Sequence, residues 1–184
     1  MMRKLTFLLA LAVAVAFCGG CISHNYPAYT PPPKKQYVFD TSKSTYSDKK
    51  ISVSISAKCN QYTGNLEGFT LTVENKTNDD LNLVWNDSFY LNNGMTDGGF
   101  MFNGVVYSKR TELKQDLIIL PKTNINIDIL PNSKVEYISP SVVGHSVLQG
   151  GWLHTDLGTG EHGAYIKFKG RGIDKRIKLL ISVS

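Results

Sequence analysis

Strict alternation of apolar and polar residues is the feature of this sequence that most constrains its fold. The segment 51–56 reads Ile-Ser-Val-Ser-Ile-Ser, and the segment 69–74 reads Phe-Thr-Leu-Thr-Val-Glu. Because successive side chains of a strand point to opposite faces of a sheet, this period of two predicts half-buried β-strands. No segment after the first 21 residues shows a convincing helical period. The sequence therefore predicts an all-β domain.

Further segments with strand character follow at short intervals along the chain. They are 81–85, 89–91, 100–107, 117–120, 125–130, 135–138, 165–168 and 177–183. Asn93-Gly94 and Asn103-Gly104 are typical of tight turns, so the second pair would split its segment into a hairpin. Short strands at this spacing predict a sandwich or barrel, which we place at residues 51–184.

The N-terminal residues have the layout of a secretory signal peptide. Arg3 and Lys4 provide the positive charge, and a largely apolar stretch of 13 residues follows from Leu5 to Phe17. This stretch is too short for a stable transmembrane anchor. An ordinary secreted protein would be cleaved after a small residue such as Ala16.

The end of this stretch offers a second interpretation. The residues Gly19-Gly20-Cys21 resemble the lipobox of bacterial lipoproteins, although Cys18 stands where that family usually has an aliphatic residue. The resemblance implies that residues 1–20 are removed and that Cys21 carries acyl chains such as palmitate. Two or more acyl chains are sufficient for stable membrane anchoring.

The residues after Cys21 bear on localisation. Ile22 and Ser23 are not acidic, and in lipoproteins an acidic residue here often retains the protein at the inner membrane. The resemblance therefore implies the outer membrane of a two-membrane bacterium, with its periplasmic or its surface face left open. Removing residues 1–20 lowers the net charge from +5 to +3. That charge is too small to indicate nucleic-acid binding.

Residues 21–50 have the composition of a tether. The segment 26–33 is rich in proline and tyrosine, and scattered lysine, serine and threonine residues follow it. Such a segment favours an extended conformation that would hold the domain away from the membrane. It could alternatively serve as a proline-rich ligand for a partner.

Whether the Cys59 thiol is free or in a disulfide depends on whether Cys21 is lipidated. If Cys21 is lipidated, Cys59 is unpaired, and we expect it to be a partly buried core residue or to form an intermolecular disulfide. If Cys21 is not lipidated, a Cys21–Cys59 disulfide becomes possible in an oxidising compartment.

The stretch GFTLTVENKTNDDLNLVWNDSFYLNN, residues 68–93, resembles the front part of immunoglobulin-like domains in small bacterial surface lipoproteins. The resemblance implies an immunoglobulin-like β-sandwich and a role in binding or scaffolding. The Cys-Trp-Cys core of antibody domains is missing, because no cysteine follows Trp85.

Sequence motifs give no support for an enzyme. The chain contains no Gly-x-Ser-x-Gly, no phosphate-binding Gly-Lys-Ser/Thr loop, no His-Glu-x-x-His and no Cys-x-x-Cys. We therefore expect no catalytic residues and no cofactor, and a protein or glycan of the cell envelope as the partner.

One glycine-rich region concentrates ionisable groups. Residues 144–163 contain His145, His154 and His162, residue types that can ligate zinc or copper, but their spacings match no standard metal motif. A plain surface loop is the expectation. The alternative function is a periplasmic metal- or ligand-binding protein that uses this loop.

Two other groups of residues could form a binding surface. The first is a set of aromatic residues near predicted loops: Phe89, Tyr90, Phe100, Phe102, Tyr107 and Trp152. The second is a set of cations near the C-terminus: Lys167, Lys169, Arg171, Lys175, Arg176 and Lys178. Cations in this arrangement usually mark a solvated face or a protected edge, with contact to anionic lipid or cell-wall polymer as the alternative.

Overall fold

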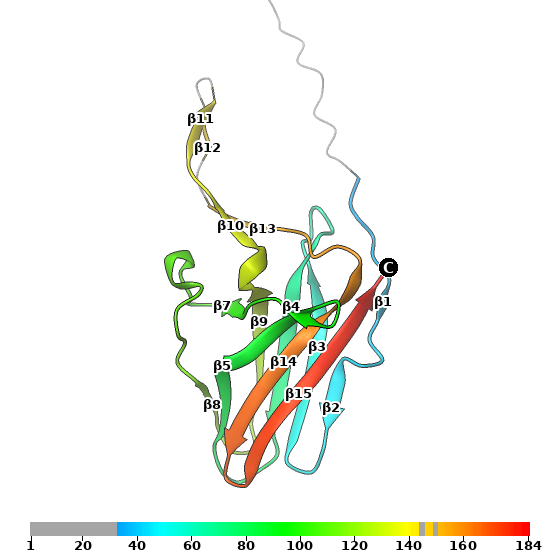
Figure 1. The fold of residues 1–184 in the computed structure, drawn as a ribbon, viewed down its shortest axis with the longest axis vertical. Coiled ribbons are helices and arrows are strands. Elements are labelled where there is room, and N and C mark those ends of the chain that lie inside the picture. The colour runs from blue at the N-terminus through cyan, green and yellow to red at the C-terminus, as the bar shows by residue number, and fades with distance from the viewer. Residues whose placement is uncertain (1–32, 144–145, 149–150) are drawn as a thin grey trace, which may run out of the picture. The chain divides into compact units, whose positions relative to one another are not determined.

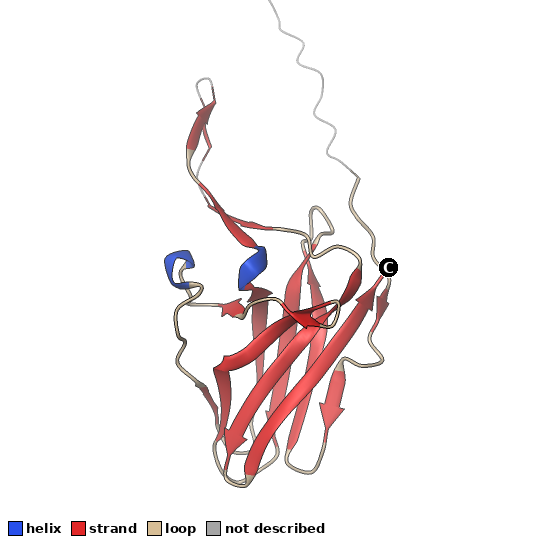
Figure 2. Ribbon diagram, in the orientation of Figure 1, coloured by secondary structure: helices blue, strands red, loops and turns tan. Residues whose placement is uncertain are grey.

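The computed structural model describes residues 33–143, 146–148 and 151–184, which contain two main antiparallel sheets (Figures 1 and 2). Sheet A has the order β1 (Phe39–Asp40), β15 (Ile173–Val183), β14 (Gly160–Gly170), β5 (Leu81–Asn92) and β6 (Met95–Thr96), and β8 (Leu117–Ile119) also pairs with β5. Sheet B has the order β2 (Thr45–Ser47), β3 (Ile51–Cys59), β4 (Leu66–Asn75), β9 (Asn124–Pro131) and β7 (Phe100–Phe102). The expected all-β sandwich is confirmed.

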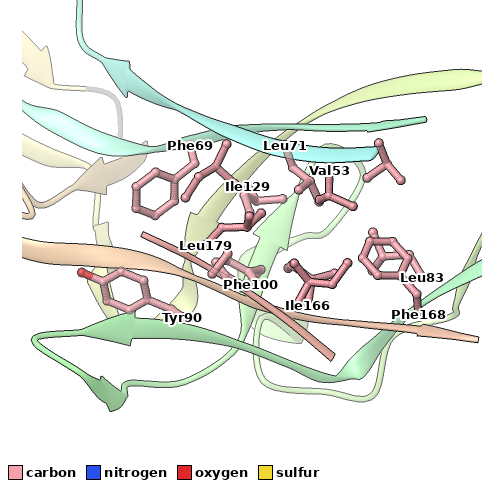
Figure 3. Packing of buried hydrophobic residues seen from close by; sticks show 14 of the residues in the cluster. Val53, Phe69, Leu71, Leu83, Tyr90, Phe100, Ile129, Ile166, Phe168 and Leu179 are labelled. Carbon is pink, nitrogen blue, oxygen red and sulfur yellow. The ribbon is translucent and has the colours of Figure 1, made fainter. Parts of the chain in front are cut away.

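The alternating residues form the core between the two sheets. In β3, Ile51, Val53 and Ile55 are at most 3% exposed, while the serines between them face outward. Phe69 and Leu71 of sheet B lie opposite side chains of sheet A such as Ile166 and Leu179, as Figure 3 shows. Residues 33–184 form one compact unit with its own core, so we expect this segment to fold independently.

The chain passes repeatedly between the two sheets in the central part of the fold. β4 in sheet B leads to β5 in sheet A, β9 returns beside β4, and β14 then pairs with β5. The three longest pairings within the sheets are β3–β4, β14–β15 and β14–β5. Because β14 lies between β5 and β15 in sheet A, the outward side chains of these three strands are neighbours.

β5 combines two segments that we expected to be separate strands. Its register against β14 shifts between Tyr165 and Lys167. At this bulge the Ser88 hydroxyl donates to the Val84 carbonyl at 2.7 Å and accepts the Lys167 backbone N–H at 3.0 Å. Because the hydroxyl substitutes for the missing ladder bonds, the polar residues in the middle of β5 do not end the strand.

The two predicted turns have different outcomes. Asn93 and Gly94 have φ of 48° and 81°, and they join β5 to β6 in a tight hairpin. The segment 100–107 is not a hairpin of two strands. It contains β7, a turn at Gly104 and the start of the 3₁₀ helix η1 (Tyr107–Lys109).

The expectation of a plain loop at residues 144–163 is wrong for the described part of that range. β10 (Val135–Ile138) pairs with β13 (Gly151–His154), and β11 (Ser141–Val143) pairs with β12 (Ser146–Leu148). These strands form two-stranded ribbons outside the main sheets, and β14 begins at Gly160.

Helical structure in the described residues is confined to η1 and to a second 3₁₀ helix, η2 (Asn132–Lys134). None of the helices in this part of the chain is long and apolar enough to span a membrane.

The sandwich begins earlier in the chain than residue 51, the expected boundary between tether and domain. β1 pairs with β15, and β2 pairs with β3, so residues 39–47 already belong to the two sheets. The compact unit begins at Pro33. Residues 1–32, including Cys21 and the first part of the expected tether, lie outside the described residues.

Candidate functional site

Of the three histidines proposed as metal ligands, His162 is the one whose side chain the structure describes. His145 lies outside the described residues. His154 pairs with Val135 in the β10–β13 ribbon, whereas His162 belongs to sheet A. Within the described part of the chain, no three His, Cys, Asp or Glu side chains lie close enough together to hold a metal ion.

His162 is a core residue. Its side chain is 1% exposed, its Nδ1 lies 2.8 Å from the Tyr90 hydroxyl, and its Nε2 has no hydrogen-bond partner among the described residues. Burial, the largest influence, holds the pKa of this imidazole below its usual value. A neutral ring stacked beside Tyr90 fits a packing role.

The aromatic residues considered as a binding surface are spread over different parts of the described structure. Tyr90 and Phe100 are core residues at 0% and 2% exposure. Phe102 stacks on Trp85 with ring centroids 4.4 Å apart. Tyr107 lies under the Arg110 guanidinium. The side chain of Trp152 lies outside the described structure, and Phe89 is on the outer face of sheet A.

The outer faces of the two sheets differ sharply in chemistry. The outer face of sheet B is hydrophilic, because β3 and β4 present serine and threonine there. Its polar groups bond to one another: Thr70 donates to Asp128, and Thr72 donates to Asn126, both at 2.7 Å. Lys58 pairs with Asp128 on the same face. This face has the character of a solvated sheet surface.

The outer face of sheet A is apolar at its centre and carries a set of cations. Tyr165 of β14 lies between Phe89 of β5 and Lys178 of β15, and Lys167 lies between Val84 and Arg176. We call this surface the basic-aromatic face; it comprises Phe89, Tyr165, Lys167, Lys169, Arg176 and Lys178. In Figure 1 its three strands lie in front of β3 and β4.

Electrostatics on this face are unbalanced. Lys167 is 5% exposed and pairs with Asp174. Burial lowers the pKa of the Lys167 ammonium, and the like charges of Arg176 and Lys169 lower it further. Among the described residues, Lys169, Arg176 and Lys178 have no carboxylate within salt-bridge distance. The face therefore carries uncompensated positive charge.

A groove lies between the short strands β7 and β8. This groove has a volume of about 600 Å³, and Trp85, Phe102, Leu117 and Ile127 line it together with polar residues of the segment 103–116. It is open and apolar, but nothing in the structure shows what would cover it.

Asp156 organises a partly buried contact that the sequence did not reveal. Its Oδ2 accepts from Tyr37 Oη at 2.5 Å and from Lys35 Nζ at 2.6 Å, and its Oδ1 accepts the Leu66 N–H at 2.9 Å and the Gly158 N–H at 3.3 Å. Burial raises the pKa of the Asp156 carboxyl, but these four hydrogen bonds together hold it below its usual value. This Asp156 clamp attaches the first described residues to the sandwich.

Cys59 is exposed at the end of β3, so the expectation of a partly buried core residue is wrong. Burial of its sulfur and the nearby charge of Asp156 raise the pKa of the thiol. A raised pKa lowers the thiolate fraction and with it the nucleophilicity of the residue.

Comparison of the chain with protein-family models, with curated proteins and with solved structures finds no match. The function is therefore argued from the fold and from the two outer faces.

Proposed function

We propose that the chain is a lipid-anchored lipoprotein of the bacterial outer membrane whose domain has a non-catalytic binding or scaffolding role. The signal peptide, the residues Gly19-Gly20-Cys21 and the proline-rich segment before Pro33 support the anchor and the tether. The difference between the two outer faces of the sandwich carries the binding role. Aromatic residues and arginine are enriched at binding surfaces, and the cations of this face are only partly neutralised by Asp174.

We further propose that the sandwich is immunoglobulin-like. The order β3-β4-β9 in one sheet and β15-β14-β5 in the other corresponds to the strand order of the two sheets in immunoglobulin domains. In such folds function is located on surfaces, so the fold itself identifies no partner.

The anchor is tested by the mass of the N-terminal peptide from protein extracted from bacterial membranes. We expect the wild-type chain to begin at a diacylglyceryl-modified Cys21, and a Cys59→Ser variant to be identical in this respect. A Cys21→Ser variant should lose the lipid and the processing. An unmodified Cys21 within a longer N-terminal peptide would refute the anchor.

The binding role is tested with the domain of residues 33–184 and washed cell envelopes. We expect saturable co-sedimentation that an excess of unlabelled domain competes away. Binding that rises linearly without saturation, or no binding, would refute the role.

A further inference from the structure

We propose that the basic-aromatic face binds an anionic polysaccharide, a chain of sugar rings that carry carboxylate groups. This inference rests on the binding role proposed above and names the chemical class of the partner. Three observations support it: the uncompensated cations, the pair of aromatic rings among them, and the limited exposure of the apolar side chains.

The cations define the charge of the ligand. Arg176 and Lys178 are alternate residues of β15 and point outward from the same face, about 7 Å apart along the strand. Lys169 lies on the neighbouring strand opposite Asp174, and Lys167, which pairs with Asp174, is adjacent to Arg176 across the ladder. Such a row complements a ligand with repeated negative charges better than a single anion, because each exposed pair contributes little alone.

The aromatic residues define the shape of the ligand. Phe89 and Tyr165 are directly opposed across β5 and β14, and both are half-buried. The face of an aromatic ring is electronegative, so it attracts the weakly positive C–H groups of a sugar ring laid on it. Cations beside such a platform would hold the carboxylates of the same chain.

A membrane surface fits these residues less well. Binding to lipid by this route requires apolar side chains that insert among the acyl chains. The large apolar side chains that are most exposed in the described structure, such as Leu113 and Tyr62, belong to other parts of the domain. Val84, which lies beside Lys167 of the basic-aromatic face, is 8% exposed, so it cannot insert.

The experiment measures binding of residues 33–184 to immobilised alginate, a carboxylated polysaccharide, over a range of salt concentrations. We expect saturable binding that weakens with salt, and no binding to neutral dextran. The charge-reversal variant Arg176→Glu/Lys178→Glu should bind at least about tenfold more weakly at low salt. Its matched control, Lys34→Glu/Lys109→Glu, makes the same change in net charge at exposed sites off the face and should bind like the wild type.

A Tyr165→Ser variant separates stacking from charge. We expect about a threefold loss of affinity with an unchanged salt dependence, because the cations remain. Circular dichroism and urea unfolding of each variant would show whether it is folded.

Equal binding by the two charge-reversal variants would overturn the inference, and so would equal binding to dextran or binding only to phosphatidylglycerol vesicles. If the domain binds washed envelopes but not alginate, this inference fails while the binding role stands.

Discussion

The Asp156 clamp gives the sharpest test of how this domain is held together. Replacing Asp156 by alanine removes both acceptor atoms. The Leu66 N–H lies in a fully buried residue, and leaving it unpaired costs about 1–3 kcal/mol. The hydrogen bond from Tyr37 to a charged acceptor contributes about 1.5–3 kcal/mol. Lys35 is half-exposed, so its ion pair adds less than about 1 kcal/mol.

We therefore expect Asp156→Ala to lower the free energy of unfolding by about 3–4 kcal/mol. For a domain of this size, that loss lowers the melting temperature by about 6–14 °C. Urea unfolding followed by the fluorescence of buried Trp85 measures the change. The control is Tyr62→Phe, because the Tyr62 side chain is 79% exposed and should not affect stability.

A double-mutant cycle isolates the contact between Tyr37 and Asp156. Tyr37→Phe should cost about 1.5–3 kcal/mol alone, and much less in the Asp156→Ala background, because its acceptor has gone. Additive effects of the two substitutions, or a loss below about 1 kcal/mol for Asp156→Ala, would refute the clamp.

The same contact predicts two pH limits. The pKa of Asp156 is lower in the folded chain than in the unfolded chain, so its contribution is present above about pH 4 and is lost as the pH falls through the folded pKa. Burial and the bond to Asp156 raise the pKa of Tyr37 to about 12. Its contribution is therefore complete below about pH 10 and is lost between pH 10 and 12, a loss that Tyr37→Phe should abolish.

Three further predictions concern buried positions. Asn75→Ala should cost about 2–4 kcal/mol in urea unfolding, because the fully buried Asn75 amide donates to three backbone carbonyls and its oxygen caps the following turn. Gly163→Ala should cost about 1–3 kcal/mol in the same assay, because a Cβ there would overlap the Leu179 carbonyl oxygen. His162→Leu should flatten the pH dependence of stability between pH 7 and 5, measured by thermal melts. Burial lowers the folded pKa of His162, so the wild type loses stability as the unfolded chain takes up a proton below about pH 6.5.

The alternation of apolar and polar residues was sufficient to predict a β-sandwich, because a period of two places one apolar face on each strand. It predicted β3 and β4 closely and found the turn at Asn93-Gly94. It failed where a strand is held by something other than an apolar face. The middle of β5 depends on the Ser88 hydroxyl, and β13 pairs with β10 in a ribbon outside the two main sheets.

Contacts between residues that are distant in the sequence could not be predicted, for a different reason. Asp156 bonds Lys35 and Leu66, which are 121 and 90 positions away, and no local periodicity reports such a distance. Part of the basic-aromatic face could be predicted from the sequence, which shows the cations of β14 and β15 as a group. Their position beside Phe89 required the register between β5 and β14.

Two ordinary explanations for the cations of sheet A can be weighed against their positions. Protection of a sheet edge accounts for Arg176 and Lys178, because β15 is paired with β1 only at its C-terminal end. It does not account for Lys169, since β14 is paired on both sides at that position. Lys167 is buried, its ammonium pairs with Asp174, and the like charges of Arg176 and Lys169 also act on it. Asp174 supplies one negative charge beside the four cations of this face, so an anionic ligand would offset the remaining repulsion, which is the physical reason to look for one here.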